Sequence, residues 1–376
     1  MFWEIFVTRK RWTVGILLAL AIGLGAFFYG RQRDAPIFPL PGPPAPAPLA
    51  VWPWPHAVKD TPHLGVTHWL DTSSPDGTTL DLFDFNFAAN PRLRFEIYDQ
   101  DEDDAQPFDD TADCWPVGVG QATRHLNAIG RGPIVAAWHG LFFSTDFSHA
   151  GGHYIGHHVT PVVLNGKVHC NIGSARWTFG AQYDKLGRPT FKTLHEPDKK
   201  TLAREFSFAA GGAQCLVKNG KPLALHPFPA IDEPAPPQPV SSTPAEAGYI
   251  PNVDWIKTSR ATMGWSRDSR HFYLLFVKQQ GTEGGGVMAL HGHGPAVSGW
   301  TVSDEQRFWL AKGVWGAINS DGGDISQITW HLPDGRYELI PAGPPQRLTL
   351  PADFAGAPQH GTLLYFYVRE AQIGKN

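Results

Sequence analysis

The sequence predicts a mixed α+β fold: a strand-rich sheet domain with a few packed helices, preceded by one transmembrane helix and a Pro-rich linker. The 376 residues are 42% hydrophobic and 18% charged, which is enough apolar material for a large core. Gly (40) and Pro (34) are abundant and Met (3) is scarce, which favours short strands joined by turns over a helical bundle. The net charge of −4 argues against nucleic acid as a partner.

The N-terminal segment has the pattern of a membrane anchor. Residues 12–30 contain no charged residue and would span about 28 Å as a helix, close to the hydrocarbon thickness of a bilayer. More basic residues precede this run than follow it, which predicts that residues 1–11 form a cytoplasmic tail and the C-terminal domain is extracytoplasmic. The residues after the run lack the small-x-small pattern of a cleavage site. We therefore expect a retained single-pass anchor rather than the alternative, a cleaved signal peptide.

Two Pro-rich stretches delimit the domain. Residues 31–61 are expected to form a semi-rigid spacer, because proline fixes φ and removes backbone donors. Residues 62–376 are then one folded domain, and residues 227–251 form a Pro-rich surface loop within it. Strand-like runs on both sides of that loop need partners across it. Two separate domains are the alternative.

Short apolar or alternating runs, bounded by Gly, Asn, Asp or Pro, predict strands along the whole domain. They are Gly65–Trp69, Thr79–Phe83, Leu93–Tyr98, Ile134–Trp138, Val159–Leu164, Phe206–Ala209, Gln214–Val217, His271–Val277 and Leu363–Val368. Asn165-Gly166 and Asn219-Gly220 predict hairpin turns. Helical spacing of apolar residues predicts helices over Gly120–Ile129 and Ser303–Lys312.

Three segments at the ends of apolar runs carry residues suited to chemistry. They are His139-Gly140-Leu141-Phe142-Phe143, Arg260-Ala261-Thr262-Met263-Gly264 and Asn319-Ser320-Asp321-Gly322-Gly323-Asp324. The last is read as a turn whose glycines let the backbone approach a ligand closely. Asp321 is a candidate general acid/base or a partner for sugar hydroxyls, and Arg260 is suited to gripping a phosphate. Taken one at a time, the last segment could be an ordinary Asp-Gly-Gly turn, and Arg260 could be a solvated surface charge.

Together and in this order, the three segments resemble the phosphodiester glycosidase domain family, the family of the lysosomal uncovering enzyme. The family shows Asn-Gly-x-Phe-Phe, then Arg-x-x-x-Gly, then Asn-x-Asp-Gly-Gly-Gly-Ser. The resemblance extends over about Pro62 to Trp330 and includes Gly211–Lys221. It implies a hydrolase that cleaves a sugar-1-phosphodiester, with catalytic residues Asp321, His139 and Arg260. The substrate-binding residues that it implies are Gly140, Phe143, Asn319, Gly322, Gly323, Asp324 and Gly212.

The chain departs from that family pattern at two positions. His139 replaces the asparagine of the first motif and adds a titratable proton, and Asp324 replaces the third glycine of the last motif and adds a negative charge. Either the substrate differs from that of the uncovering enzyme, or binding is retained without catalysis. The second option describes a non-catalytic glycan-binding module on a membrane tether.

The cysteines and histidines leave alternatives open. The three cysteines form no CxxC pair, so two of them are paired or all three are buried thiols. Histidines at 149, 153, 157, 158 and 169 have a spacing that would line one helix face, but the glycines among them disfavour a helix. His291 and His293 also lie among glycines that disfavour a helix. We expect a His-rich loop contacting sugar hydroxyls and no cofactor, with a divalent metal as the alternative.

Overall fold

The computed structural model describes residues 46–47, 49–114, 117–146, 155–170, 177–223, 225, 257–280 and 298–371. The predicted anchor at residues 12–30 and the Pro-rich loop at 227–251 lie outside the described residues. Among the described residues, no helix has the length and apolar character that crossing a membrane requires.

The largest sheet in the described part of the chain has eight strands, and its neighbours pair antiparallel. In spatial order they are β1 (Val58–His63), β2 (Val66–Asp71), β3 (Thr79–Asn86), β17 (His271–Lys278), β16 (Arg260–Trp265), β18 (Gly316–Gly322), β14 (Gln214–Lys218) and β15 (Lys221–Pro222).

A second sheet has six strands: β21 (Leu348–Leu350), β20 (Tyr337–Ile340), β19 (Ile328–His331), β6 (Ile134–His139), β22 (Leu364–Glu370) and β4 (Leu93–Asp99). A third has five: β10 (Lys167–Cys170), β9 (Val162–Leu164), β13 (Phe208–Gly211), β11 (Trp177–Tyr183) and β12 (Pro189–His195). A small fourth sheet consists of β5 (Thr111–Asp113), β8 (Ile155–His157) and β7 (Ser144–Asp146).

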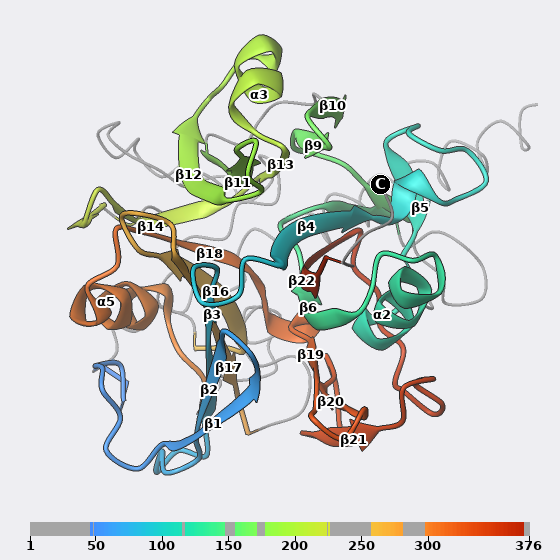
Figure 1. Cartoon of the computed structure of the whole chain (residues 1–376). Helices are drawn as coiled ribbons and strands as arrows, with labels where there is room; N and C mark the ends of the chain where they lie inside the picture. Colours follow the sequence, from blue (N-terminus) through green and yellow to red (C-terminus); the bar gives the residue numbers. More distant parts are fainter. Residues whose placement is uncertain are drawn as a thin grey trace, which may run out of the picture. The chain divides into compact units, whose positions relative to one another are not determined.

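The helices of the described residues are few and short. They are η1 (Gln100–Glu102), α2 (Val119–Ala128), α3 (Lys199–Glu205), α5 (Val302–Lys312) and η4 (Gly323–Ile325). Figure 1 shows α5 beside β14 and β18, whereas α2 lies beside β6. The predicted mixed, strand-rich α+β class is therefore confirmed for this part of the chain.

One aromatic core joins the three larger sheets. Phe272 of β17 is buried, and its ring lies 5.3 Å from that of Phe95 on β4 and 4.6 Å from that of Phe191 on β12. Each ring comes from a different sheet, so burying them ties the sheets together. A fully buried phenylalanine contributes roughly 2–3 kcal/mol through the area it removes from water.

Helix α5 covers the opposite face of the eight-stranded sheet. It begins at a capping box in which Thr301 and Asp304 bond each other's backbone amides, and it ends at Gly313 with φ 76°. On its sheet-facing side, the indole Nε1–H of Trp309 donates to Thr262 Oγ1 over 2.8 Å. These contacts fix the helix over β16 and β18, where the motif residues lie.

Part of the predicted linker is folded. Trp54 is buried, and its ring lies 5.5 Å from that of Phe308 on α5. Val58–His63 forms β1 and pairs with β2. The expected start of the domain at residue 62 is corrected accordingly: among the described residues of the linker, the segment before residue 62 already packs on the domain, because its tryptophans supply apolar surface that covers α5.

The sequence patterns located nine of the 22 strands among the described residues, and they misjudged one important segment. Both Asn-Gly hairpin turns are confirmed, with both residues of each at positive φ. The predicted helices are confirmed as α2 and α5. The turn predicted at Asn319–Asp324 is wrong in its first half, because residues up to Gly322 extend β18 and only then does η4 begin. The polar residues of this segment suggested a turn, although they belong to a strand that lies between β16 and β14.

Candidate active site

The end of β18 is where the three motif segments meet. The carbonyl oxygen of Asp321 accepts a hydrogen bond from the His139 ring over 2.8 Å, and the amide of Asp321 donates to the Gly140 carbonyl over 3.4 Å. Arg260 is the strand partner of Gly322, across the β16–β18 pair. Three segments that lie about 60 to 180 residues apart in the chain thus meet at the main chain of one strand end.

His139 is a buried, neutral connector between strands. Its Nδ1 accepts from the Gln327 amide over 3.1 Å, which assigns the ring proton to Nε2, and Nε2–H then donates to the Asp321 carbonyl. Burial lowers the pKa of His139 to about 4, outweighing the two backbone hydrogen bonds. Both ring nitrogens hold backbone, so His139 positions the end of β18 rather than exchanging protons with a substrate.

Gly140 is required by close packing. Its amide donates to the Leu364 carbonyl over 2.8 Å, and a Cβ at this position would lie 2.6 Å from the Cβ of Leu364. No other residue fits without displacing β22. The glycine therefore lets the chain leave β6 directly beside β18.

Arg260 lies on the face of the sheet that α5 covers. Its Nε–H donates to the Trp300 carbonyl over 2.8 Å and lies 3.8 Å from Oε1 of Glu305. Neither carboxyl oxygen of Glu305 has a hydrogen-bond partner among the described residues. Burial raises the pKa of Glu305 to about 8, although Arg260 opposes the shift. At neutral pH, Arg260 therefore packs against a protonated carboxyl group.

The predicted catalytic residues do not share one face. Arg260 pairs with Val277, which belongs to the core under α5, whereas the ring of His139 lies edge-on to Phe276 in the core between the sheets. Successive strand residues point to opposite faces, so the two side chains approach the strand end from opposite sides. The His139 ring contacts the main chain of Asp321.

Asp321 and Asn319 differ in their surroundings. Asp321 is partly exposed, and its Oδ1 accepts from the Gly322 amide over 2.8 Å. Asn319 is buried, and its Nδ2 donates to Oε1 of Gln214 over 3.2 Å. Asn319 Oδ1 and Gln214 Nε2 have no partner among the described residues. Buried polar atoms without partners are uncommon, and they mark places where water or a ligand group completes the structure.

The remaining predicted glycines lie around the same strand end. Gly323 has φ 76°, and its amide donates to the Ser259 carbonyl over 2.9 Å. A Cβ on Gly322 would lie 3.0 Å from the same carbonyl oxygen. Asp324 follows within η4. This run is bound tightly to the segment before β16, so its glycines serve close backbone packing.

Gly212 lies two residues before Gln214, the β14 partner of Asn319, and Phe143 lies three residues after Gly140. Gly212 has φ 86°, and a Cβ there would lie 3.7 Å from the Cβ of Phe142. Phe143 packs against a small cluster that includes Cys114 and Leu363. Phe143 therefore contributes to a core.

Sequence reasoning missed two polar residues of this region, Glu305 and Gln214. Glu305 follows the helix cap, where an acidic residue is ordinarily solvated and stabilises the helix dipole. Gln214 lies within a predicted strand whose partner was unknown. Only the placement of α5 over β16, β18 and β14 shows that both side chains are buried.

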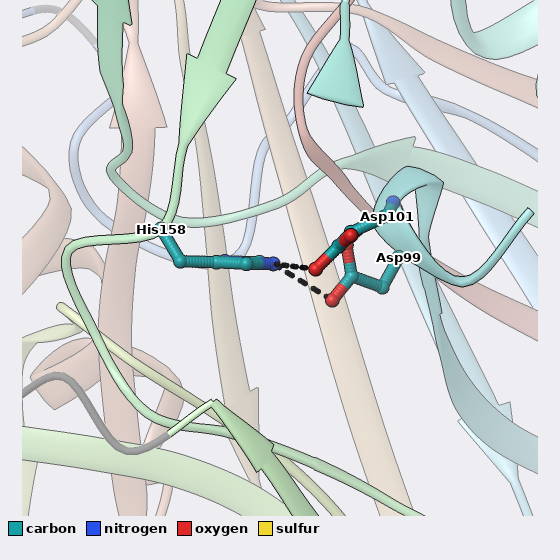
Figure 2. A group of neighbouring side chains, drawn as sticks. All are labelled: Asp99, Asp101 and His158. Carbon is teal, nitrogen blue, oxygen red and sulfur yellow. Dashed lines mark hydrogen bonds and ion pairs between the residues drawn. The ribbon is translucent and has the colours of Figure 1, made fainter. Parts of the chain in front are cut away.

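The cysteines and histidines are also placed. Cys114, Cys170 and Cys215 are buried thiols. His157 lies on β8 and His169 on β10, so among the described residues the histidines form no helical row. His149, His153, His291 and His293 lie outside the described residues. His158, Asp99 and Asp101 are buried, and Figure 2 shows their side chains together; this group has the composition of a metal site.

Comparison with solved structures gives distant similarities. The zebrafish N-acetylglucosamine-1-phosphodiester alpha-N-acetylglucosaminidase catalytic domain, auto-inhibited by its pro-peptide, aligns with TM-score 0.44 and 13% identity over 86% of this chain and 87% of that chain. A putative exported protein from Burkholderia pseudomallei gives 0.43 and 12% over 79% and 75%. A hypothetical protein from Synechocystis gives 0.40 and 10% over 82% and 64%.

No family model matches the chain, and no curated protein sequence matches it. The three structural similarities have TM-scores below 0.5 and identities below 25%.

Proposed function

We propose that the chain is a phosphodiester-glycosidase-like hydrolase that cleaves a sugar-1-phosphodiester in a glycan or exopolysaccharide. The observation that carries the proposal is the meeting of all three motif segments at the end of β18, through the contacts of Asp321 with His139 and Gly140 and the pairing of Arg260 with Gly322. The motifs resemble those of phosphodiester glycosidases in residue type and order.

The reaction adds water across the bond between the anomeric carbon and the phosphate oxygen. The hydroxyl goes to the anomeric carbon and a proton goes to the departing oxygen, giving a free sugar and a phosphomonoester. Asp321 is the proposed acid/base because its carboxyl group is partly exposed and fixed by the Gly322 amide. Arg260 is proposed to counter the phosphate charge, with Glu305 and the Trp300 carbonyl positioning it.

The role proposed for His139 is positioning. A neutral imidazole whose two nitrogens bond backbone cannot transfer a proton without releasing Asp321 of β18 or Gln327, the residue before β19. Asn319, Gly322, Gly323, Asp324, Gly140 and Gly212 remain proposed substrate-side residues. Phe143 is better explained as a core residue, since it packs on the cluster of Cys114 and Leu363.

A second candidate is a glycan-binding module without turnover. The observation that favours it is the placement of His139 and Arg260 on opposite faces of the sheet, which separates two of the three expected catalytic groups. In that case the strand end would bind a sugar phosphate without cleaving it.

One experiment separates these functions. The purified chain is incubated with a panel of methyl diesters of sugar 1-phosphates, in both anomeric forms, and products are followed by phosphorus NMR. Hydrolase function predicts a phosphomonoester signal in the wild type that is lost in Asp321→Asn and retained in Asp334→Asn, an exposed control. Saturable binding with no product, equal in wild type and Asp321→Asn, would overturn the hydrolase and favour the binding module.

We also propose that residues 12–30 hold the domain at the extracytoplasmic face of a membrane. The support is the charge-free apolar run and its basic N-terminal flank. Carbonate extraction of membranes tests this: the full chain should stay in the pellet, and a chain beginning at residue 46 should be released. Equal release of both chains would refute the anchor.

A further inference from the structure

A buried group of two carboxylates and one imidazole lies outside the site described above. Asp99 ends β4, Asp101 lies in η1, and His158 follows β8. All three side chains are 1–2% exposed. Figure 2 shows the imidazole of His158 pointing at both carboxylates. The proposed hydrolase uses none of these residues.

The geometry of the three ligand atoms suits one metal ion. Nε2 of His158 lies 2.8 Å from Oδ2 of Asp99 and 3.9 Å from Oδ2 of Asp101. One ligand atom from each residue lies within 4.8 Å of the others. Ligands about 2.0–2.2 Å from a shared ion are separated by roughly 3–4.4 Å, so small side-chain rotations would place all three around it.

The charge of the group calls for a cation. Among the described residues, every ion pair that Asp99 and Asp101 form is with His158. Two carboxylates and one imidazole therefore carry a net charge of −1 or −2 in a buried place, depending on whether the ring is protonated. Residues 99–113 contain eight acidic residues and no Lys or Arg, so the surrounding segment adds further negative charge. Buried charge without compensation is costly, and a divalent cation would compensate it.

Backbone hydrogen bonds also orient the proposed ligands. Oδ1 of Asp99 accepts from the Asp101 amide, and the carboxylate of Asp101 accepts from the amides of Asp109 and Asp110. The His158 amide donates to the Asp110 carbonyl over 2.9 Å. Backbone bonds of this kind hold carboxylate ligands in place around metals.

We propose that Asp99, Asp101 and His158 bind one divalent transition-metal ion, Zn²⁺ or Mn²⁺. An imidazole nitrogen beside two carboxylates suits these ions, whereas Ca²⁺ and Mg²⁺ prefer oxygen ligands alone. The ion would replace the proton on Nε2 that now bonds Asp99. It would brace β8 against η1, and β8 pairs with β7, the strand that follows the Gly140–Phe143 segment. The proposed role is structural support of that segment.

The test is metal binding by the chelator-treated full chain, purified without a polyhistidine tag. Isothermal titration with Zn²⁺ and with Mn²⁺ should show one site per chain for at least one of the two ions. Asp101→Asn and His158→Gln should each weaken binding by about tenfold or more. Asp334→Asn, an exposed acidic control, should leave it unchanged. The thermal midpoint of the wild type should rise with the bound ion, since ligands of the folded state stabilise it.

A neighbouring set of oxygen ligands provides the competing outcome. Asp101 also lies near Asp104 and Asp109, and these three could hold an ion without histidine. Tight binding that survives His158→Gln but is lost in Asp104→Asn would assign the ion to that oxygen set and overturn the proposal. Absence of one-site binding of both ions to the wild type would overturn it as well.

A spectroscopic measurement keeps the proposal falsifiable if a variant does not fold. Co²⁺ added to the wild-type chain should give visible absorption bands of a nitrogen- and oxygen-ligated ion, and Zn²⁺ should abolish them by displacement. A spectrum identical to that of Co²⁺ in buffer would refute the site. Sugar-diester hydrolysis is measured separately, so failure of the metal site leaves the proposed hydrolase standing.

Discussion

Replacing Glu305 with glutamine should change how the stability of the domain depends on pH. Burial raises the pKa of this carboxyl group from 4.5 to about 8 in the folded chain, with neither oxygen bonded among the described residues. Between those two pH values, the folded state binds a proton that the unfolded state has lost. The free energy of unfolding of the wild type must therefore fall as pH rises through this window.

The size of the effect follows from the two pKa values. The window spans about 3.5 pH units, and each contributes about 1.4 kcal/mol. The Glu305 contribution therefore costs the wild type about 5 kcal/mol between pH 4 and pH 9, of which about 3 kcal/mol is already lost at pH 7. Glutamine has nearly the shape of the protonated acid and does not titrate, so Glu305→Gln should lack this loss.

The assay is urea unfolding followed by circular dichroism at five pH values from 4.5 to 9. The difference in unfolding free energy between Glu305→Gln and wild type should grow steadily in favour of the variant up to about pH 8 and then level off. Glu196→Gln, at an exposed glutamate, should track the wild type throughout. The contradicting result would be unfolding free energies of the wild type and of Glu305→Gln that change with pH in parallel over the whole range. In that case Glu305 would not be a buried protonated acid, and its proposed support of Arg260 would fail.

Three further predictions test the site and the domain boundary. Gly140→Ala should destabilise the domain by about 1–3 kcal/mol in urea melts, because its Cβ would lie 2.6 Å from that of Leu364; an unchanged melt would show that β22 yields freely. His139→Asn should reduce the loss of stability on acidification. The ring of the wild type has a pKa of about 4 in the folded chain against 6.5 unfolded, so the wild type loses about 3 kcal/mol of unfolding free energy as pH falls from 6.5 to 4. An equally steep loss of stability in the variant would contradict this. Trp54→Ala should lower the free energy of unfolding by about 3–5 kcal/mol, whereas Val51→Ala, at an exposed position, should lower it little. Equally small effects of both substitutions would show that residues 47–61 are a linker and not part of the folded domain.

The sequence predicted what depends on local chemistry. Asn165-Gly166 and Asn219-Gly220 specify their hairpins because both positions take positive φ. Helix α5 follows from its apolar spacing and its capping residues. Two of the three strands that supply the central aromatic rings, β4 and β17, are apolar enough to be recognised alone, whereas the third, β12, was not predicted.

What could not be predicted depends on partners distant in the chain. The run Asn319-Ser320-Asp321 looks like a turn until β16 and β14 are seen on either side of it. The pairing of Asp99 and Asp101 with His158 joins residues almost sixty positions apart, so no local spacing reveals it. Trp54 resembles a linker residue in a Pro-rich context, and its burial depends on the position of α5.

The candidate site illustrates both cases. The motifs at His139, Arg260 and Asp321 are recognisable in sequence, and their meeting at one strand end is a property of the fold. The locked, neutral state of His139 depends on the amide of Gln327, a residue that no motif includes. The positioning role of His139 therefore depends on a contact that its motif does not contain.

The most direct test of the proposed hydrolase is to identify the bond that it breaks. Hydrolysis of a sugar-1-phosphodiester is run in ¹⁸O-labelled water, and both products are analysed by mass spectrometry. A glycosidase breaks the bond between the anomeric carbon and oxygen, so the label should appear in the free sugar, with turnover lost in Asp321→Asn. Label in the phosphate, with release of a sugar 1-phosphate, would show cleavage at phosphorus and contradict the account.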